Sequence, residues 1–79
     1  MYQSCYIKDK ELGVYLNMRI QITKSEEKYP KLGDVFEAKN YPYDSEKYTL
    51  LKQLNPITFK VIKDDIGLNE YKSNCRVIG

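Results

Sequence analysis

The sequence contains no histidine and no tryptophan, only two cysteines, and only two arginines among its 13 basic residues. Histidine is the commonest general acid or base, so its absence removes the usual acid–base sites and any Cys–His nucleophile pair. With two cysteines and no histidine, the ligands for a zinc site are missing. We therefore expect a protein that is not an enzyme and that binds neither a metal ion nor a cofactor.

Long apolar runs are also missing: no stretch approaches the roughly 20 consecutive apolar residues that a membrane-crossing helix needs. The first ten residues, MYQSCYIKDK, lack the charged and apolar regions of a secretion signal. We therefore expect a cytoplasmic protein that makes no membrane contact, with Cys5 and Cys75 as reduced thiols. A chain of 79 residues has room for a single domain, residues 1–79, with a thin core.

Alternation of apolar and polar residues predicts strands along most of the chain. The clearest alternation runs from residue 13 to residue 24, and a second strand is predicted over 34–39. Shorter strands are predicted over 2–7, 57–63, 68–71 and 75–78, with turns every 8–12 residues. The side chains expected to face the core are Val14, Leu16, Met18, Ile20 and Ile22, opposed by Val35 or Phe36, Phe59 and Val61.

The segment 45–54 has two interpretations. One is a short helix capped by Asp44 or Ser45, because both residue types are preferred at helix N-termini. The other, which we favour, is a strand over 48–52, because aromatic and β-branched residues at its start prefer strands. The pattern as a whole predicts a mainly β fold of five to seven short strands, arranged as a small SH3-like barrel or a strongly bent antiparallel sheet.

Two segments resemble short SH3-like barrel proteins encoded by bacteriophages and prophages. Residues 32–38, LGDVFEA, resemble the strand entry G-x-x-[FY]-x-[AV] of these proteins. Residues 59–71, FKVIKDDIGLNEY, are similar to their later hairpin, y-x-V-I-x-D-D-x-G. The resemblance covers residues 18–78. It implies a small binding protein that acts on a host protein in the host cytoplasm, and it implies no catalytic residues.

Tyrosine is unusually frequent, with eight copies in the chain. Tyrosine is enriched at interfaces because it combines a large apolar ring with a hydroxyl group. In a protein this small, packing at the rim of the core is the competing explanation for each tyrosine. Tyr41 and Tyr43 flank a proline in a predicted loop, which favours a binding role for this pair. The predicted protein-binding residues are Tyr41, Tyr43, Lys39, Lys47, Tyr15 and Arg19.

Single-stranded nucleic acid is the alternative partner, because small barrels bind it by stacking bases on aromatic rings within a basic groove. The residues that would serve are Tyr15, Tyr41, Tyr43 and Tyr71 with Lys39, Lys60 and Lys63. A net charge of only +2 and the scarcity of arginine favour a protein partner instead. The functional prediction is therefore a protein that binds and inhibits a host protein, with single-stranded nucleic-acid binding as the alternative.

Overall fold

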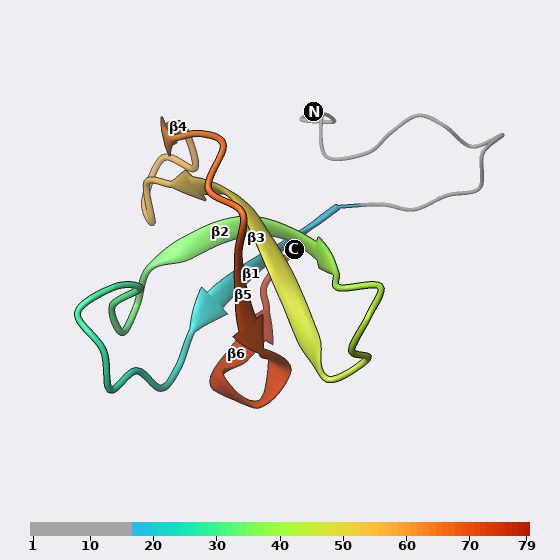
Figure 1. The fold of residues 1–79 in the computed structure, drawn as a ribbon. Coiled ribbons are helices and arrows are strands. Elements are labelled where there is room, and N and C mark those ends of the chain that lie inside the picture. Colours follow the sequence, from blue (N-terminus) through green and yellow to red (C-terminus); the bar gives the residue numbers. More distant parts are fainter. Residues whose placement is uncertain (1–16) are drawn as a thin grey trace, which may run out of the picture.

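A computed structural model describes residues 17–79, which form one strongly bent antiparallel sheet of six strands (Figure 1). The predicted mainly β fold with a bent sheet is thereby confirmed. The predicted strand 2–7, the positions Val14, Tyr15 and Leu16, and Cys5 lie outside the described residues. The elements are β1 (Met18–Ile22), β2 (Val35–Asn40), β3 (Lys47–Leu54), β4 (Val61–Lys63), β5 (Leu68–Tyr71), the 3-10 turn η3 (Lys72–Asn74) and β6 (Cys75–Val77).

Strand β3 is the longest element and connects both halves of the sheet. On one side it pairs with β2, and on the other its two ends pair with different strands, β5 at residues 47–50 and β4 at residues 53–54. The sheet order is β4-β3-β2-β1-β6, with β5 joined to β3 outside this path. The strand interpretation of segment 45–54 is confirmed. Asp44 caps no helix, and its carboxylate instead accepts the amide of Glu46 at 2.9 Å in the turn before β3.

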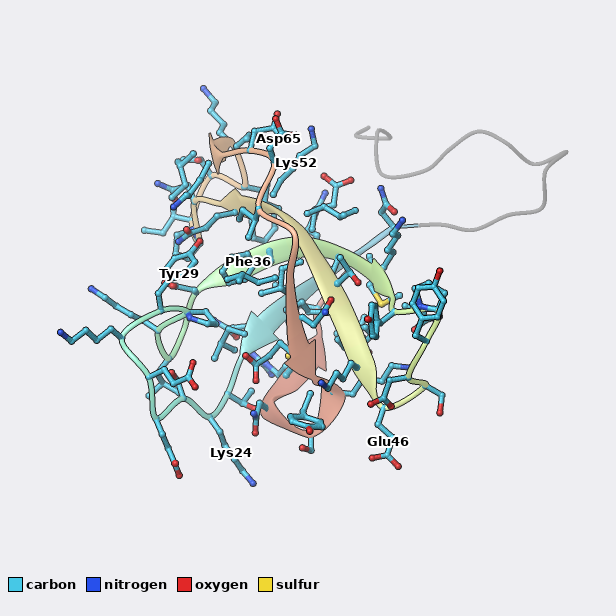
Figure 2. The ribbon with its side chains drawn as sticks, viewed as in Figure 1. Lys24, Tyr29, Phe36, Glu46, Lys52 and Asp65 are labelled. Atoms are coloured by element: carbon cyan, nitrogen blue, oxygen red, sulfur yellow. The ribbon has the colours of Figure 1, made fainter. Side chains whose placement is uncertain are left out.

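The core lies on the inner, concave face of this sheet. Phe36 lies at the centre of the molecule, whereas Lys24, Glu46 and Asp65 extend from its periphery (Figure 2). Each large apolar side chain buried here contributes about 1.5–3 kcal/mol. Register places the core residues opposite one another across β1, β2 and β3. The buried cluster consists of Ile20, Ile22, Phe36, Ala38, Tyr48 and Leu50, with Met18, Tyr29, Ile66 and Cys75 packed against it.

The predicted inward positions of Ile20 and Ile22 are confirmed, and Met18 is half-buried. Val35 and Phe36 are both buried, although consecutive strand residues point to opposite faces. Phe36 joins the inner core. Val35 pairs with the buried Leu54. Both lie on the face of the sheet opposite Phe36, which we call the outer face, and they are outside the inner core cluster.

The predicted strand 57–63 is wrong over its first four residues, which belong to a turn. The side-chain Oδ1 of Asn55 accepts the amides of Ile57 at 2.8 Å and Thr58 at 3.0 Å. The amide of Phe59 donates to the Asn55 carbonyl at 2.8 Å, and Phe59 has a φ of 63°. Local side-chain hydrogen bonds of this kind compete with strand formation, so the apolar alternation did not indicate a strand here.

The expected inward orientation of Val61 is also wrong, because 49% of this residue is exposed. Ile57, at the tip of the turn, is 87% exposed. Phe59 is half-buried, but its ring packs against the guanidinium of Arg19, whose Cζ lies 4.5 Å from the ring centroid. The apolar residues of this turn therefore lie outside the inner core. Within residues 17–79, no helix has the length and apolarity to cross a membrane.

Candidate functional site

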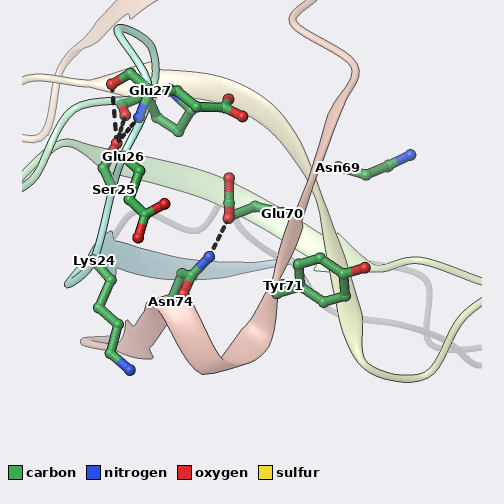
Figure 3. Close-up of a pocket in the computed structure, with 9 residues that line it drawn as sticks. Lys24, Ser25, Glu26, Glu27, Asn69, Glu70, Tyr71 and Asn74 are labelled. Atoms are coloured by element: carbon green, nitrogen blue, oxygen red, sulfur yellow. Dashed lines mark hydrogen bonds between the residues drawn. The ribbon is translucent and has the colours of Figure 1, made fainter.

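Strand β5 separates two polar surfaces because its side chains alternate in direction. Glu70 points toward η3, whereas Asn69 and Tyr71 point to the other side of the strand (Figure 3). Pairing with β3 sets Glu70 beside Tyr48, which faces the core, and Asn69 beside Thr49. The Thr49 hydroxyl donates to Asn69 Oδ1 at 3.0 Å, which fixes the outer side of this strand pair.

On the Glu70 side, a cleft of about 390 Å³ lies between residues 24–30 and the corner formed by β5 and η3 (Figure 3). Its lining contains the three carboxylates of Glu26, Glu27 and Glu70 and one ammonium group, that of Lys24. Three negative charges and one positive charge give the cleft a net charge of −2. We call this site the acidic cleft.

Both walls of the acidic cleft are held by their own hydrogen bonds. Ser25 Oγ donates to the Pro30 carbonyl at 2.5 Å and accepts the amide of Glu27 at 3.3 Å, which closes the loop over 24–30. On the opposite wall, Asn74 Nδ2 donates to Glu70 Oε2 at 2.7 Å. The Asn74 carbonyl accepts the amide of residue 23 at 2.7 Å and that of residue 24 at 3.3 Å, so the two walls are also tied together.

Cys75 lies next to the acidic cleft and is a free, half-buried cysteine. Its thiol donates to the Tyr71 carbonyl, with Sγ 3.4 Å from the oxygen. Burial, and secondarily the negative charge of Glu70, raises the pKa of Cys75 from its ordinary value of 9.0 to about 11. Because the thiolate is the reactive form, Cys75 is a poor nucleophile at neutral pH.

The other side of β5 continues into a second surface, the lysine–tyrosine face, which consists of Lys39, Tyr41, Tyr43, Lys47 and Tyr71. Register places Lys39 opposite Thr49, and Lys47 opposite Tyr71. The Tyr41 amide donates to the Lys47 carbonyl at 3.0 Å, which extends the β2–β3 pairing by one residue. Because opposed residues of antiparallel strands point to the same face, these side chains gather in two adjacent rows.

The aromatic rings of the lysine–tyrosine face contact neighbouring side chains. The rings of Tyr41 and Tyr43 meet edge to face, with centroids 5.5 Å apart. Lys47 Nζ lies 4.8 Å from the centroid of the Tyr71 ring. Tyr43 is 84% exposed and Tyr71 is 49% exposed, so both rings remain accessible to a partner.

The structure thus brings together four of the six predicted binding residues, Lys39, Tyr41, Tyr43 and Lys47. Arg19 is not among them, because its guanidinium packs on Phe59 in the turn that follows the far end of β3. Tyr15 lies outside the described residues. Tyr71 was predicted only for the nucleic-acid alternative. It joins the lysine–tyrosine face because β5 pairs with β3. Local sequence patterns do not reveal that pairing.

The two other lysines of the nucleic-acid alternative lie elsewhere. Lys63 Nζ is 5.0 Å from the ring centroid of Tyr29, a residue packed against the inner core. Lys60 belongs to the turn between β3 and β4. The nucleic-acid residues proposed from the sequence are therefore not all on one surface.

Within residues 17–79, no group of three or more His, Cys, Asp or Glu side chains is arranged to hold a metal ion. Of the adjacent pair Asp64 and Asp65, Asp64 forms an exposed ion pair with Lys52 at 3.4 Å. Comparisons of the chain with protein families, curated proteins and solved structures find no match. The acidic cleft and the lysine–tyrosine face are therefore the features on which a function can be argued.

Proposed function

We propose that this chain is a non-enzymatic protein-binding module whose acidic cleft receives a lysine or arginine side chain of its partner. The observation that carries the proposal is the cleft itself, where three carboxylates and one ammonium group surround a volume of about 390 Å³. Charge complementarity of this kind selects partners and accelerates their association.

The finer form of the proposal is that the partner is a host protein that the chain inhibits in the host cytoplasm. It is supported by the resemblance of residues 32–38 and 59–71 to short SH3-like barrel proteins of phages and prophages. The bent antiparallel sheet is compatible with that resemblance.

Affinity capture from a bacterial lysate tests the proposal when it compares matched charge reversals. Glu27→Lys changes the charge of the acidic cleft, whereas Glu46→Lys makes the same change in the turn before β3. Both side chains are exposed, so neither variant should alter the circular-dichroism melting curve. A partner retained by the wild type and Glu46→Lys but lost by Glu27→Lys is the expected result. Equal retention by both variants would contradict the role of the cleft.

A further inference from the structure

Strand register gathers basic side chains on the outer face of the sheet, although the whole chain has a net charge of only +2. Arg76 lies beside Gln21 on this face, and its guanidinium donates to the Gln21 side-chain oxygen at 3.0 Å. Among the outer-face side chains of β1, β2, β3, β5 and β6, the one acidic residue is Glu37, and it is buried. The basic side chains of the outer face are Arg19, Lys39, Lys47, Lys52 and Arg76. Two of them have acidic neighbours, because Arg19 and Lys52 lie opposite Glu37 and Lys52 also pairs with Asp64.

The lysine–tyrosine face is the part of this outer surface where cations and exposed rings occur together. Across β2, β3 and β5, one row runs from Lys39 to Asn69, and the next contains Tyr41, Lys47 and Tyr71. Three adjacent strands span about 10 Å. Within that width, Lys47 lies between Tyr41 and Tyr71, and the Tyr43 ring, in the turn between β2 and β3, packs edge to face on Tyr41. The carboxylate of Glu70 points to the opposite side (Figure 3).

We propose that the lysine–tyrosine face binds single-stranded nucleic acid, with its lysines on the phosphates and its tyrosine rings against the bases. Surfaces that bind single strands combine positive charge along the backbone with aromatic side chains on which bases stack. An acidic protein segment would satisfy the lysines equally well, and tyrosine is also enriched at protein interfaces. Alternation of a cation with rings across adjacent strands, as at Tyr41, Lys47 and Tyr71, is the combination that single-strand surfaces use. The arrangement therefore favours a ligand that carries both phosphates and planar bases.

The two surfaces meet at β5, where Asn69 and Tyr71 border the acidic cleft although their side chains point away from Glu70. This inference is still tested separately from the protein-binding role proposed above, because the carboxylate Glu27 and the lysines Lys39 and Lys47 belong to different surfaces. The acidic cleft repels phosphates, so a nucleic acid would be confined to the outer face. A charge reversal in the cleft tests the protein partner, and a charge reversal on the lysine–tyrosine face tests the nucleic acid. Failure of one proposal leaves the other intact.

The test is fluorescence anisotropy of labelled dT20 and rU20 with the full chain, at 50 and 200 mM NaCl. We expect a Kd in the micromolar range at the lower salt, with affinity falling about sevenfold at the higher salt, as two phosphate contacts predict. Comparison of dT20 with rU20 distinguishes DNA from RNA as the ligand. A labelled polyglutamate peptide serves as the acidic-protein arm, and we expect it to bind at least tenfold more weakly.

Matched variants locate the binding surface. The double variant Lys39→Glu/Lys47→Glu should weaken oligonucleotide binding at least tenfold, whereas Lys28→Glu/Lys31→Glu, on the loop before β2, should weaken it less than threefold. Because Lys47 also contacts the Tyr71 ring, a second variant avoids any effect on folding. Tyr43→Ala removes an 84% exposed ring and should cost at least fivefold in affinity, while Ile57→Ala, at an equally exposed position, should cost nothing.

Three results would overturn the proposal. The first is no binding of either oligonucleotide at about 100 µM protein and 50 mM NaCl, the weak end of ordinary non-specific affinity. The second is an equal loss in the two double lysine variants, which would show that only overall charge matters. The third is polyglutamate binding as tight as that of the oligonucleotides, which would identify the ligand as an acidic protein segment.

Discussion

The two sides of strand β5 differ in charge although only one step along the backbone separates them. Glu70 contributes to a cleft with three carboxylates and one ammonium group, whereas Tyr71, the next residue, lies opposite Lys47 on a surface with two lysines. The cause is the alternation of side chains along a strand, which sends adjacent residues to opposite faces. A near-neutral whole-chain charge can therefore combine two oppositely charged surfaces, each suited to a different kind of partner.

The two sides also differ in how they are built. The acidic cleft depends on loops, since its far wall is the hydrogen-bonded segment 24–30 and its near wall is the corner at η3. The lysine–tyrosine face depends chiefly on strand register, because β2, β3 and β5 align its two rows. Perturbing a loop should therefore affect the cleft first, whereas perturbing the shared sheet should affect both surfaces at once.

The largest effect is expected from Ile20→Asp, which attacks the sheet that carries both surfaces. Ile20 is fully buried, and a buried unpaired charge costs several kcal/mol, a large part of the stability of so small a domain. We expect the variant to lose its cooperative thermal transition, measured by circular dichroism, together with both binding activities. Ile57→Asp, at an 87% exposed position, is the matched control and should melt like the wild type. Cooperative melting of Ile20→Asp would refute the core assignment.

A smaller effect on the free energy of unfolding is expected when tyrosines on opposite sides of the sheet are replaced. Tyr48→Ala removes a buried ring from the inner core, and we expect a loss of about 3 kcal/mol in the free energy of unfolding. Tyr43→Ala removes an exposed ring from the lysine–tyrosine face and should change the unfolding free energy by less than about 0.5 kcal/mol. Urea denaturation of the two variants gives both values. Similar losses would mean that Tyr43 packs as part of the fold and is not held free for a partner.

The sequence predicted the parts of the fold in which side-chain alternation coincides with burial. Ile20 and Ile22 alternate with polar residues and are buried, and the strand around Val35 lies within one residue of its predicted start. The prediction failed over 57–60, where an equally regular alternation lies in a turn that the Asn55 side chain stabilises. Alternation of apolar and polar residues therefore indicates a strand only where no local side-chain hydrogen bond competes for the backbone amides.

The candidate sites were predicted less completely, because they depend on register between distant strands. Tyr41, Tyr43, Lys39 and Lys47 are close in sequence, so their grouping followed from the loop alone. Tyr71 joins them only because β5 pairs with β3 at Lys47. The acidic cleft combines residues 24–27 with residue 70, and no local pattern links segments more than 40 residues apart.

The smallest predicted effect uses Cys75 as a reporter of the charge on the cleft side. Burial raises the pKa of its thiol to about 11, and the charge of Glu70 adds to the shift. Removing that charge with Glu70→Gln should lower the pKa, increase the thiolate fraction at pH 8 and accelerate alkylation several-fold. Lys39→Gln changes the charge on the opposite side of the sheet and should leave the rate unchanged.

The measurement is the rate of iodoacetamide labelling on the peptide that contains Cys75, followed by mass spectrometry between pH 7 and pH 10. Because the pKa of about 11 lies above this range, the wild-type rate should rise nearly tenfold with each pH unit. At pH 8 it should be about 100-fold below the rate of a thiol at the ordinary pKa of 9.0. If Lys39→Gln accelerated labelling as much as Glu70→Gln, Cys75 would be reporting a general loosening of the sheet, and the electrical separation of the two sides of β5 would be refuted.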